Sequence, residues 1–216
     1  MDNISKGVSD LLVVHPDGKK IFIGKRNVHP QPDWWLVGGR MFTGETAVDS
    51  CRRLLQRELT LDIHPNRFTT VCCQTMAWHM RQQEPKHHGT VDLQVVLSFQ
   101  VKEDELSKVV FDRNEYDEVK WVDAHEILNG DYHPALKHPI RCLLTKWKLK
   151  KLEGIIDSDN NDDVAKAAKG FVQSMRECNS FLVQEQKDGQ SNYKVKNEKM
   201  NYEANVFVKA PGIEDE

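Results

Sequence analysis

The pattern of apolar and polar residues in the first part of the chain predicts three strands. Two apolar runs, Leu11–Val14 and Ile21–Gly24, flank a Pro-Asp-Gly sequence at 16–18, which is typical of a tight turn. This arrangement predicts a β-hairpin. A third, short strand is expected at Trp34–Val37. Two glycines follow it, and their backbone carbonyls can approach an ion closely because no side chain intervenes.

A helix is predicted from Thr46 to Leu59. Its apolar residues recur at helical spacing and so form a stripe along one face. The stripe consists of Ala47, Val48, Cys51, Leu54 and Leu55. Thr46 and Asp49 lie three residues apart and resemble a capping box, which favours a helix start at this point.

The middle of the chain is β-rich. We expect strands at 68–77, 92–101 and 119–122, and a short helix at 124–128. The polar loop at 81–89 contains two histidines and is a candidate location for a catalytic base. After Pro139, apolar residues at helical spacing, with lysines around them, predict a further helix.

The composition changes in the last quarter of the chain. An acidic, low-complexity link at 157–163 precedes a predicted helix from 164 to about 184, and the final thirty residues are polar. We therefore predict a domain of residues 1–154 and a C-terminal extension, residues 155–216, that is helical and then partly disordered.

Composition restricts the class of protein. The chain has 216 residues, of which 39% are hydrophobic, so one domain with an extension is expected. A net charge of −3 favours no particular partner, and neither DNA nor RNA is predicted. Neither an apolar run of membrane-spanning length nor a signal-peptide core is present in the sequence. Five cysteines without a CxxC pair favour reduced thiols over disulfides or zinc, so we expect a cytoplasmic protein.

The candidate chemistry lies in the segment from Gly39 to Leu61. Gly39 is followed after five residues by Glu45, and Glu45 after seven residues by Arg53. This spacing resembles the Nudix box, the signature of the Nudix hydrolase superfamily. In that family Glu follows the box Arg directly, and two more acids lie on the same helical face, where together they bind divalent cations.

Only one of those three acids is kept. The corresponding positions hold Leu54, Arg57 and Glu58. Residues at i, i+3 and i+4 of a helix share a face, so three carboxylates there would hold several metal ions on a diphosphate. A helix face with Leu, Arg and Glu has about zero net charge. We therefore expect a single metal ion at Glu58 rather than a cluster of ions. Arg57 either pairs with a phosphate or neutralises Glu58.

One branch of the superfamily, the GDP-mannose mannosyl hydrolases, has nearly the same departure and uses a single Mg²⁺. The chain from Asp10 to about Val122 resembles this branch. The matching segments are Gly24-Lys25-Arg26, Trp34-Trp35, Leu36 to Arg40 and the box. The resemblance implies a Nudix α/β/α sandwich, in which a mixed sheet lies between the box helix and the helix after Pro139.

The resemblance also implies roles for individual residues. Glu58 would be the metal carboxylate, and the Gly38 carbonyl a second ligand. Arg26 would stabilise the leaving diphosphate, Asp10 falls on a catalytic Asp, and Arg53 would orient the acidic face. A homodimer is compatible with the branch, although no residue requires one.

Four positions depart from the branch. Gln94 replaces a Tyr that contacts the leaving group, and Glu115 replaces a metal-ligand Gln while keeping an oxygen donor. Tyr116 replaces the catalytic His, and a phenol with a reference pKa of about 10 is a poor base at neutral pH. Thr60 replaces the box Gly.

Other residues beside the expected cleft are candidates for substrate binding. Arg40, like Arg26, is expected to contact phosphate rather than form only a surface salt bridge. Trp35 or its neighbour would stack on a base, unless both rings only pack in the core.

These features predict a Mg²⁺-dependent hydrolase, with Mn²⁺ as an alternative ion, that acts on a nucleoside diphosphate sugar or a related nucleoside diphosphate derivative. Ordinary P–O–P cleavage with Glu115 or Glu118 as base is a variant of this hypothesis. The alternative is a catalytically inactive Nudix-fold module that binds a nucleotide or a protein partner.

Overall fold

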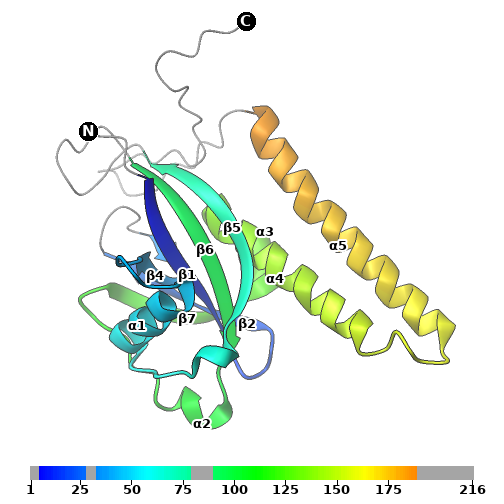
Figure 1. Ribbon diagram of the computed structural model, residues 1–216, viewed down its shortest axis with the longest axis horizontal. Helices are drawn as coiled ribbons and strands as arrows, with labels where there is room; N and C mark the ends of the chain where they lie inside the picture. The colour runs from blue at the N-terminus through cyan, green and yellow to red at the C-terminus, as the bar shows by residue number, and fades with distance from the viewer. Residues whose placement is uncertain (1–4, 28–32, 79–89, 189–216) are drawn as a thin grey trace, which may run out of the picture.

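The computed structural model describes residues 5–27, 33–78 and 90–188 (Figure 1). Within these ranges seven strands form one sheet. The strands are β1 (Ser5–Val14), β2 (Lys20–Arg26), β3 (Trp34–Trp35), β4 (Val37–Arg40), β5 (Thr69–Trp78), β6 (Thr90–Gln100) and β7 (Tyr116–Asp123). The helices are α1 (Ala47–Leu59), the 3₁₀ turn η1 (Pro65–Arg67), α2 (Glu103–Leu106), α3 (Ala124–Asn129), α4 (Pro134–Glu153) and α5 (Asn161–Asp188).

The sheet is mixed, as predicted. Strand β1 runs parallel to β6 and antiparallel to β2 and β4. The predicted hairpin is confirmed, with Val14 paired to Ile21. Strand β5 pairs with β6, and both β3 and β7 pair with β2. The segment expected to be one strand at Trp34–Val37 is two short strands, β3 and β4, which pair with different neighbours.

Alternating residues of the strands face two separate cores. Leu12 and Ile23 pack on the side of α3 and α4, whereas Leu11 and Phe22 pack on the side of α1. This alternation follows from the two-residue period of a strand. The sheet therefore lies between α1 on one face and α3 with α4 on the other, which confirms the Nudix α/β/α sandwich (Figure 1).

Helix α4 begins earlier than predicted. It starts at Pro134 after the cap residue His133, whose ring nitrogen Nδ1 accepts a hydrogen bond from the Ala135 N–H. Proline suits the first helical position because its fixed φ matches the helix and no N–H is needed there. Pro139 is thus inside the helix rather than before it.

The predicted helix in the C-terminal extension is present as α5, which packs along α4 (Figure 1). Thr145 of α4 and Ser174 of α5 are hydrogen-bonded through their hydroxyls at 2.8 Å. The described ranges contain no helix that is both long and apolar enough to cross a membrane. The histidines of the loop at 81–89 and the tail after Asp188 lie outside the described residues.

Candidate active site

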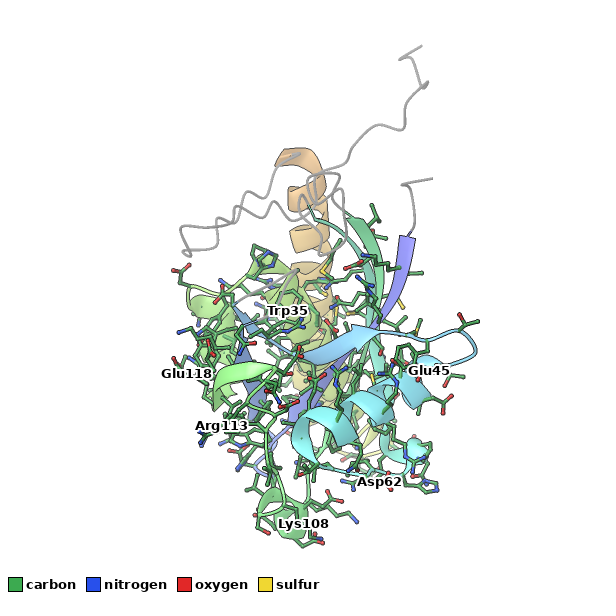
Figure 2. All side chains as sticks on the ribbon, turned by 90° about the vertical axis from the view of Figure 1, so that its left-hand side faces the viewer. Trp35, Glu45, Asp62, Lys108, Arg113 and Glu118 are labelled. Atoms are coloured by element: carbon green, nitrogen blue, oxygen red, sulfur yellow. The ribbon has the colours of Figure 1, made fainter. Side chains whose placement is uncertain are left out.

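The start of the box helix is held by a capping box. The Thr46 hydroxyl accepts from the Asp49 N–H, and the Asp49 carboxylate accepts from the Thr46 N–H, as the sequence predicts. Figure 2 faces α1, with Glu45 labelled at its N-terminal side and Glu118 of β7 labelled on the side where α1 ends. The candidate chemistry lies at this second end.

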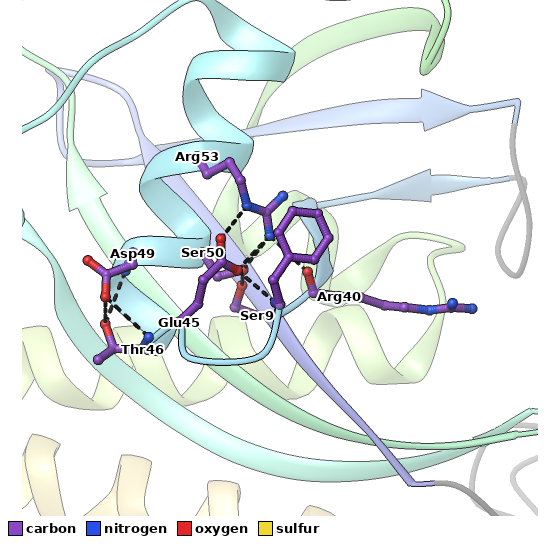
Figure 3. Close-up of polar contacts among 8 residues, drawn as sticks. Ser9, Arg40, Glu45, Thr46, Asp49, Ser50 and Arg53 are labelled. Atoms are coloured by element: carbon purple, nitrogen blue, oxygen red, sulfur yellow. Dashed lines mark hydrogen bonds and ion pairs between the residues drawn. The ribbon is translucent and has the colours of Figure 1, made fainter.

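Glu45 and Arg53, the first Glu and the Arg of the box motif, form a two-point ion pair (Figure 3). Arg53 donates from Nε to one Glu45 oxygen at 2.5 Å and from Nη2 to the other at 2.8 Å. Arg53 also donates to the Arg40 carbonyl, at 2.9 Å, and its guanidinium lies over the Phe42 ring. The hydrogen bonds from Arg53 lower the pKa of Glu45 to about 2. This part of the box fixes the loop that joins β4 to α1.

Glu58, the retained acid, is fully buried near the end of α1. One of its carboxylate oxygens accepts a hydrogen bond from the Tyr116 hydroxyl, and the other accepts from Nη2 of Arg57. Burial raises the pKa of Glu58. Of the two alternatives for Arg57, the structure shows the guanidinium paired with Glu58.

Tyr116 is the first residue of β7 and is 1% exposed. Its ring packs on Gly24 of β2, where an added Cβ would lie only 2.2 Å from a ring atom. Burial, followed by the charge of Glu58, raises the pKa of Tyr116 well above its ordinary value of 10. At neutral pH Tyr116 is therefore a hydrogen-bond donor to Glu58 and not a base.

Arg26 and Glu115 form a second ion pair beside Glu58. Arg26 donates to one Glu115 oxygen from Nε at 3.1 Å and from Nη2 at 2.5 Å. Both side chains are mostly buried, with 13% and 17% exposed. Arg26 interacts electrostatically with Glu58 and Asp10 as well, so these groups form one cluster.

Asp10 lies on β1 with 3% of its surface exposed. Its Oδ2 accepts hydrogen bonds from the Trp35 indole, at 3.1 Å, and from the Gln94 amide. Burial raises the pKa of Asp10 from 3.8 to about 7, against the lowering effect of these donors and of Arg26. A carboxyl group with a pKa of about 7 can exchange a proton near neutral pH.

A chain of amides that the sequence did not reveal orients Asp10. Pro139 has no N–H, so the Ala135 carbonyl one turn earlier lacks its usual helical donor. That carbonyl accepts a hydrogen bond from the Gln74 side-chain amide at 3.1 Å, and the same amide donates to Oε1 of the Gln94 side chain. With its oxygen occupied, Gln94 presents its NH₂ to Asp10. The proline within α4 therefore fixes the direction of a hydrogen bond in the candidate site.

The remaining predicted residues differ in their proximity to this cluster. Gly38 pairs with Asp10 across β4 and β1, and a Cβ at Gly38 would lie 1.8 Å from Asp10 Oδ1. Trp35 is 3% exposed and packs in the core, edge-on to His133, so its indole N–H rather than its ring face reaches the site. The exposed Arg40 side chain points away from the Glu45–Arg53 pair (Figure 3).

The donor set fits one Mg²⁺ at most, and only after Arg57 moves. Mg²⁺ prefers oxygen ligands, and the Glu58 oxygen now bonded to Arg57 is the one such a cation would take. Arg57 is 49% exposed and can turn into solvent, whereas Tyr116 is buried and stays. The three carboxylates of Asp10, Glu58 and Glu115 and the two guanidiniums of Arg26 and Arg57 leave a formal charge of −1. This charge is too small for a cluster of two or three ions.

Three solved structures of Nudix-type proteins are similar to this chain. A MutT Nudix hydrolase from Burkholderia pseudomallei superposes with a TM-score of 0.51 at 15% identity, over 65% of this chain and 99% of that chain. For the C. elegans Ap4A hydrolase the TM-score is 0.47 at 14% identity, over 67% and 99%. A MutT/nudix family protein from Enterococcus faecalis gives 0.43 at 17% identity, over 56% of this chain and only 44% of that chain.

No curated protein sequence matches the chain. The sequence model of the NUDIX domain matches residues 6–143, which is 138 of the 216 residues. Nudix hydrolases generally use divalent metals such as Mg²⁺ or Mn²⁺. Because the match covers well over half of the chain and the fold is the α/β/α sandwich, the protein belongs to the Nudix family.

Proposed function

We propose that this protein is a Nudix-type hydrolase that acts on a nucleoside diphosphate sugar or a related nucleoside diphosphate derivative. The observation that carries the proposal is the buried cluster of Asp10, Arg26, Glu58, Glu115 and Tyr116. Burying so many ionisable groups costs folding free energy, and such clusters are concentrated at functional sites. The resemblance to the GDP-mannose mannosyl hydrolases, which rests on sequence motifs, suggests the sugar nucleotide.

Arg26 and Arg57 are the proposed ligands of the diphosphate. A guanidinium can donate two parallel hydrogen bonds to phosphate oxygens, and both side chains belong to the cluster, Arg26 13% exposed and Arg57 49% exposed. Binding of the diphosphate would draw Arg57 from Glu58, which releases one carboxylate oxygen. The same movement thus couples substrate binding to the opening of a metal ligand.

Glu58, the Gly38 carbonyl and Glu115 are the residues that would hold one Mg²⁺. When bound, the ion supplies charge stabilisation to the departing diphosphate. Asp10 is proposed to hold the proton released from water, because its pKa of about 7 leaves a large fraction ionised at neutral pH. Trp35 and Gln94 would orient the Asp10 carboxylate through their N–H groups.

The test is a nucleotide-release assay on GDP- and UDP-sugars with Mg²⁺ or Mn²⁺. We expect turnover by the wild type and a loss of at least about 100-fold in the Glu58→Gln variant. The matched control is Glu126→Gln, an exposed substitution on α3 away from the cluster. Turnover that is indifferent to Glu58→Gln would reject the proposal. Reaction in ¹⁸O water then separates attack on the sugar carbon from attack on phosphorus, since the label enters the sugar or the phosphate.

A second function is favoured by one observation. Both oxygens of Glu58 already accept hydrogen bonds, so the cluster is complete without a metal. A catalytically inactive module that binds a nucleotide or a protein partner would have such a site. Calorimetry without metal distinguishes the two functions: nucleotide binding without hydrolysis supports the module, and turnover that needs the metal supports the enzyme.

A further inference from the structure

A cluster of thiol and imidazole groups lies where the C-terminal extension meets the Nudix domain. Cys72 is on β5, His138 and Cys142 are on α4, and Cys178 is on α5. His138 and Cys142 are four residues apart in one helix, so their side chains share a face. The other two residues are far away in sequence, and the fold brings them to this face.

The ligand atoms are close enough to surround one ion. Those of Cys72, His138 and Cys142 all lie within 4.8 Å of one another. The Cys142 sulfur is 3.6 Å from Nε2 of His138 and 3.4 Å from the Cys178 sulfur. The Cys178 thiol also interacts with the His138 ring. Three ligand atoms therefore surround one point, and the Cys178 sulfur adjoins them through Cys142 and His138.

The two separations that involve the Cys142 sulfur match edges of a zinc tetrahedron. With Zn–S of about 2.3 Å and Zn–N of about 2.0 Å, two sulfur ligands are about 3.8 Å apart, and a sulfur and a nitrogen about 3.5 Å. The observed values of 3.4 Å and 3.6 Å differ from these by only a few tenths of an ångström. The Cys142–Cys178 separation is also well above the 2.0 Å of a disulfide bond.

The surroundings favour a closed structural site. His138 and Cys178 are buried, and Cys72 and Cys142 are half-buried. On the same pair of helices, Thr145 of α4 is hydrogen-bonded to Ser174 of α5. A metal bound at the cluster would add its binding free energy to the docking of α5 on α4.

We propose that Cys72, His138, Cys142 and Cys178 form a structural Zn²⁺ site that fastens α5 to the Nudix domain. Three sulfurs and one imidazole nitrogen are a Cys₃His set, which selects zinc over Mg²⁺ because thiolates are soft ligands. Binding energy at such a site becomes energy for docking the helix. Since none of these residues belongs to the Glu58 cluster, this inference stands apart from the proposed hydrolase.

The test measures metal in the full chain, purified with a reducing agent and without chelator. Elemental mass spectrometry should find one zinc per chain, and Co²⁺ in its place should give tetrahedral and thiolate-to-metal absorption bands. Cys72→Ser should reduce the zinc content several-fold. Its matched control is Cys73→Ser, because Cys73 is exposed and points to the opposite side of β5, and this variant should keep the zinc.

A second measurement does not depend on the variants. Chelation of the wild type should raise hydrogen exchange along α5 and leave β1 and β6 protected. The proposal is overturned if the wild type carries no zinc and takes up no Co²⁺, or if Cys72→Ser and Cys73→Ser retain equal zinc. It is also overturned if mass spectrometry finds Cys142 and Cys178 joined as a disulfide in the native protein.

Discussion

Replacing Asp10 by Asn should change how stability depends on pH. The folded protein keeps the Asp10 proton up to about pH 7, whereas the unfolded chain releases it near 3.8. The free energy of unfolding therefore falls as pH rises from about 4 to about 7, because the folded state must ionise a buried carboxyl. At about 1.4 kcal/mol for each pH unit between the two pKa values, ionised Asp10 costs the folded state about 4 kcal/mol.

Asparagine removes this cost and keeps the shape. Its carbonyl oxygen can accept the hydrogen bonds that Trp35 and Gln94 now donate to Oδ2. The comparison must be the difference between variant and wild type, since buried His133 acts in the opposite sense. Burial lowers the pKa of His133 from 6.5 to about 3, so its contribution to stability falls as pH falls. Subtracting the wild type cancels that contribution.

Urea denaturation at pH 4.5 and pH 8 measures the effect. Asp10→Asn should exceed the wild type by about 1 kcal/mol at pH 4.5 and by about 4 kcal/mol at pH 8. Asp104→Asn, an exposed substitution on α2, should show the same small difference at both pH values. A difference for Asp10→Asn that changes by less than about 1 kcal/mol between the two pH values would refute the reasoning.

Two further predictions concern residues beside the site. His133→Asn keeps a capping side chain at the start of α4, but this side chain cannot be protonated. The free energy of unfolding of the variant minus that of the wild type should therefore be about 3 kcal/mol larger at pH 4 than at pH 7. Urea curves at the two pH values measure this gain, and equal differences would contradict it. Thr60 has φ 57, a left-handed conformation that β-branched residues rarely adopt. Thr60→Gly should therefore raise stability by about 1 kcal/mol in thermal or urea unfolding, and a loss would mean that the hydroxyl bond to the Lys108 carbonyl matters more.

The sequence was most informative where structure depends on local spacing. Thr46 and Asp49 form the predicted cap because both partners lie within one helical turn. Leu12 and Leu11 face opposite cores because strands alternate. The start of α4 at Pro134 could have been predicted, since a proline that follows a capping residue favours the first position of a helix. The change in pattern after Pro139 was the more visible feature and was misleading.

Contacts between elements that are distant in the sequence could not be predicted. Gln74 has no recognisable motif, and its role follows only from the carbonyl that Pro139 frees. Arg57 and Glu58 are adjacent, and side chains at i and i+1 do not normally face each other on a helix. The two side chains are nevertheless hydrogen-bonded to each other in the structure. The Cys₃His cluster likewise has only one local signal, the spacing of His138 and Cys142.

The substitutions in the box change the charge of the ligand that this face of α1 can bind. Leu54, at the first lost acid, is 1% exposed and packs against Gly39, so that position belongs to the core and not to a ligand site. Arg57, at the second, places a half-exposed positive charge beside the one remaining acid. A face with one acid and one mobile arginine attracts phosphate before it attracts a cation. We therefore predict ordered binding, with the diphosphate first and the metal second. Metal titrations should then show tight Mn²⁺ binding only when a nucleoside diphosphate is present.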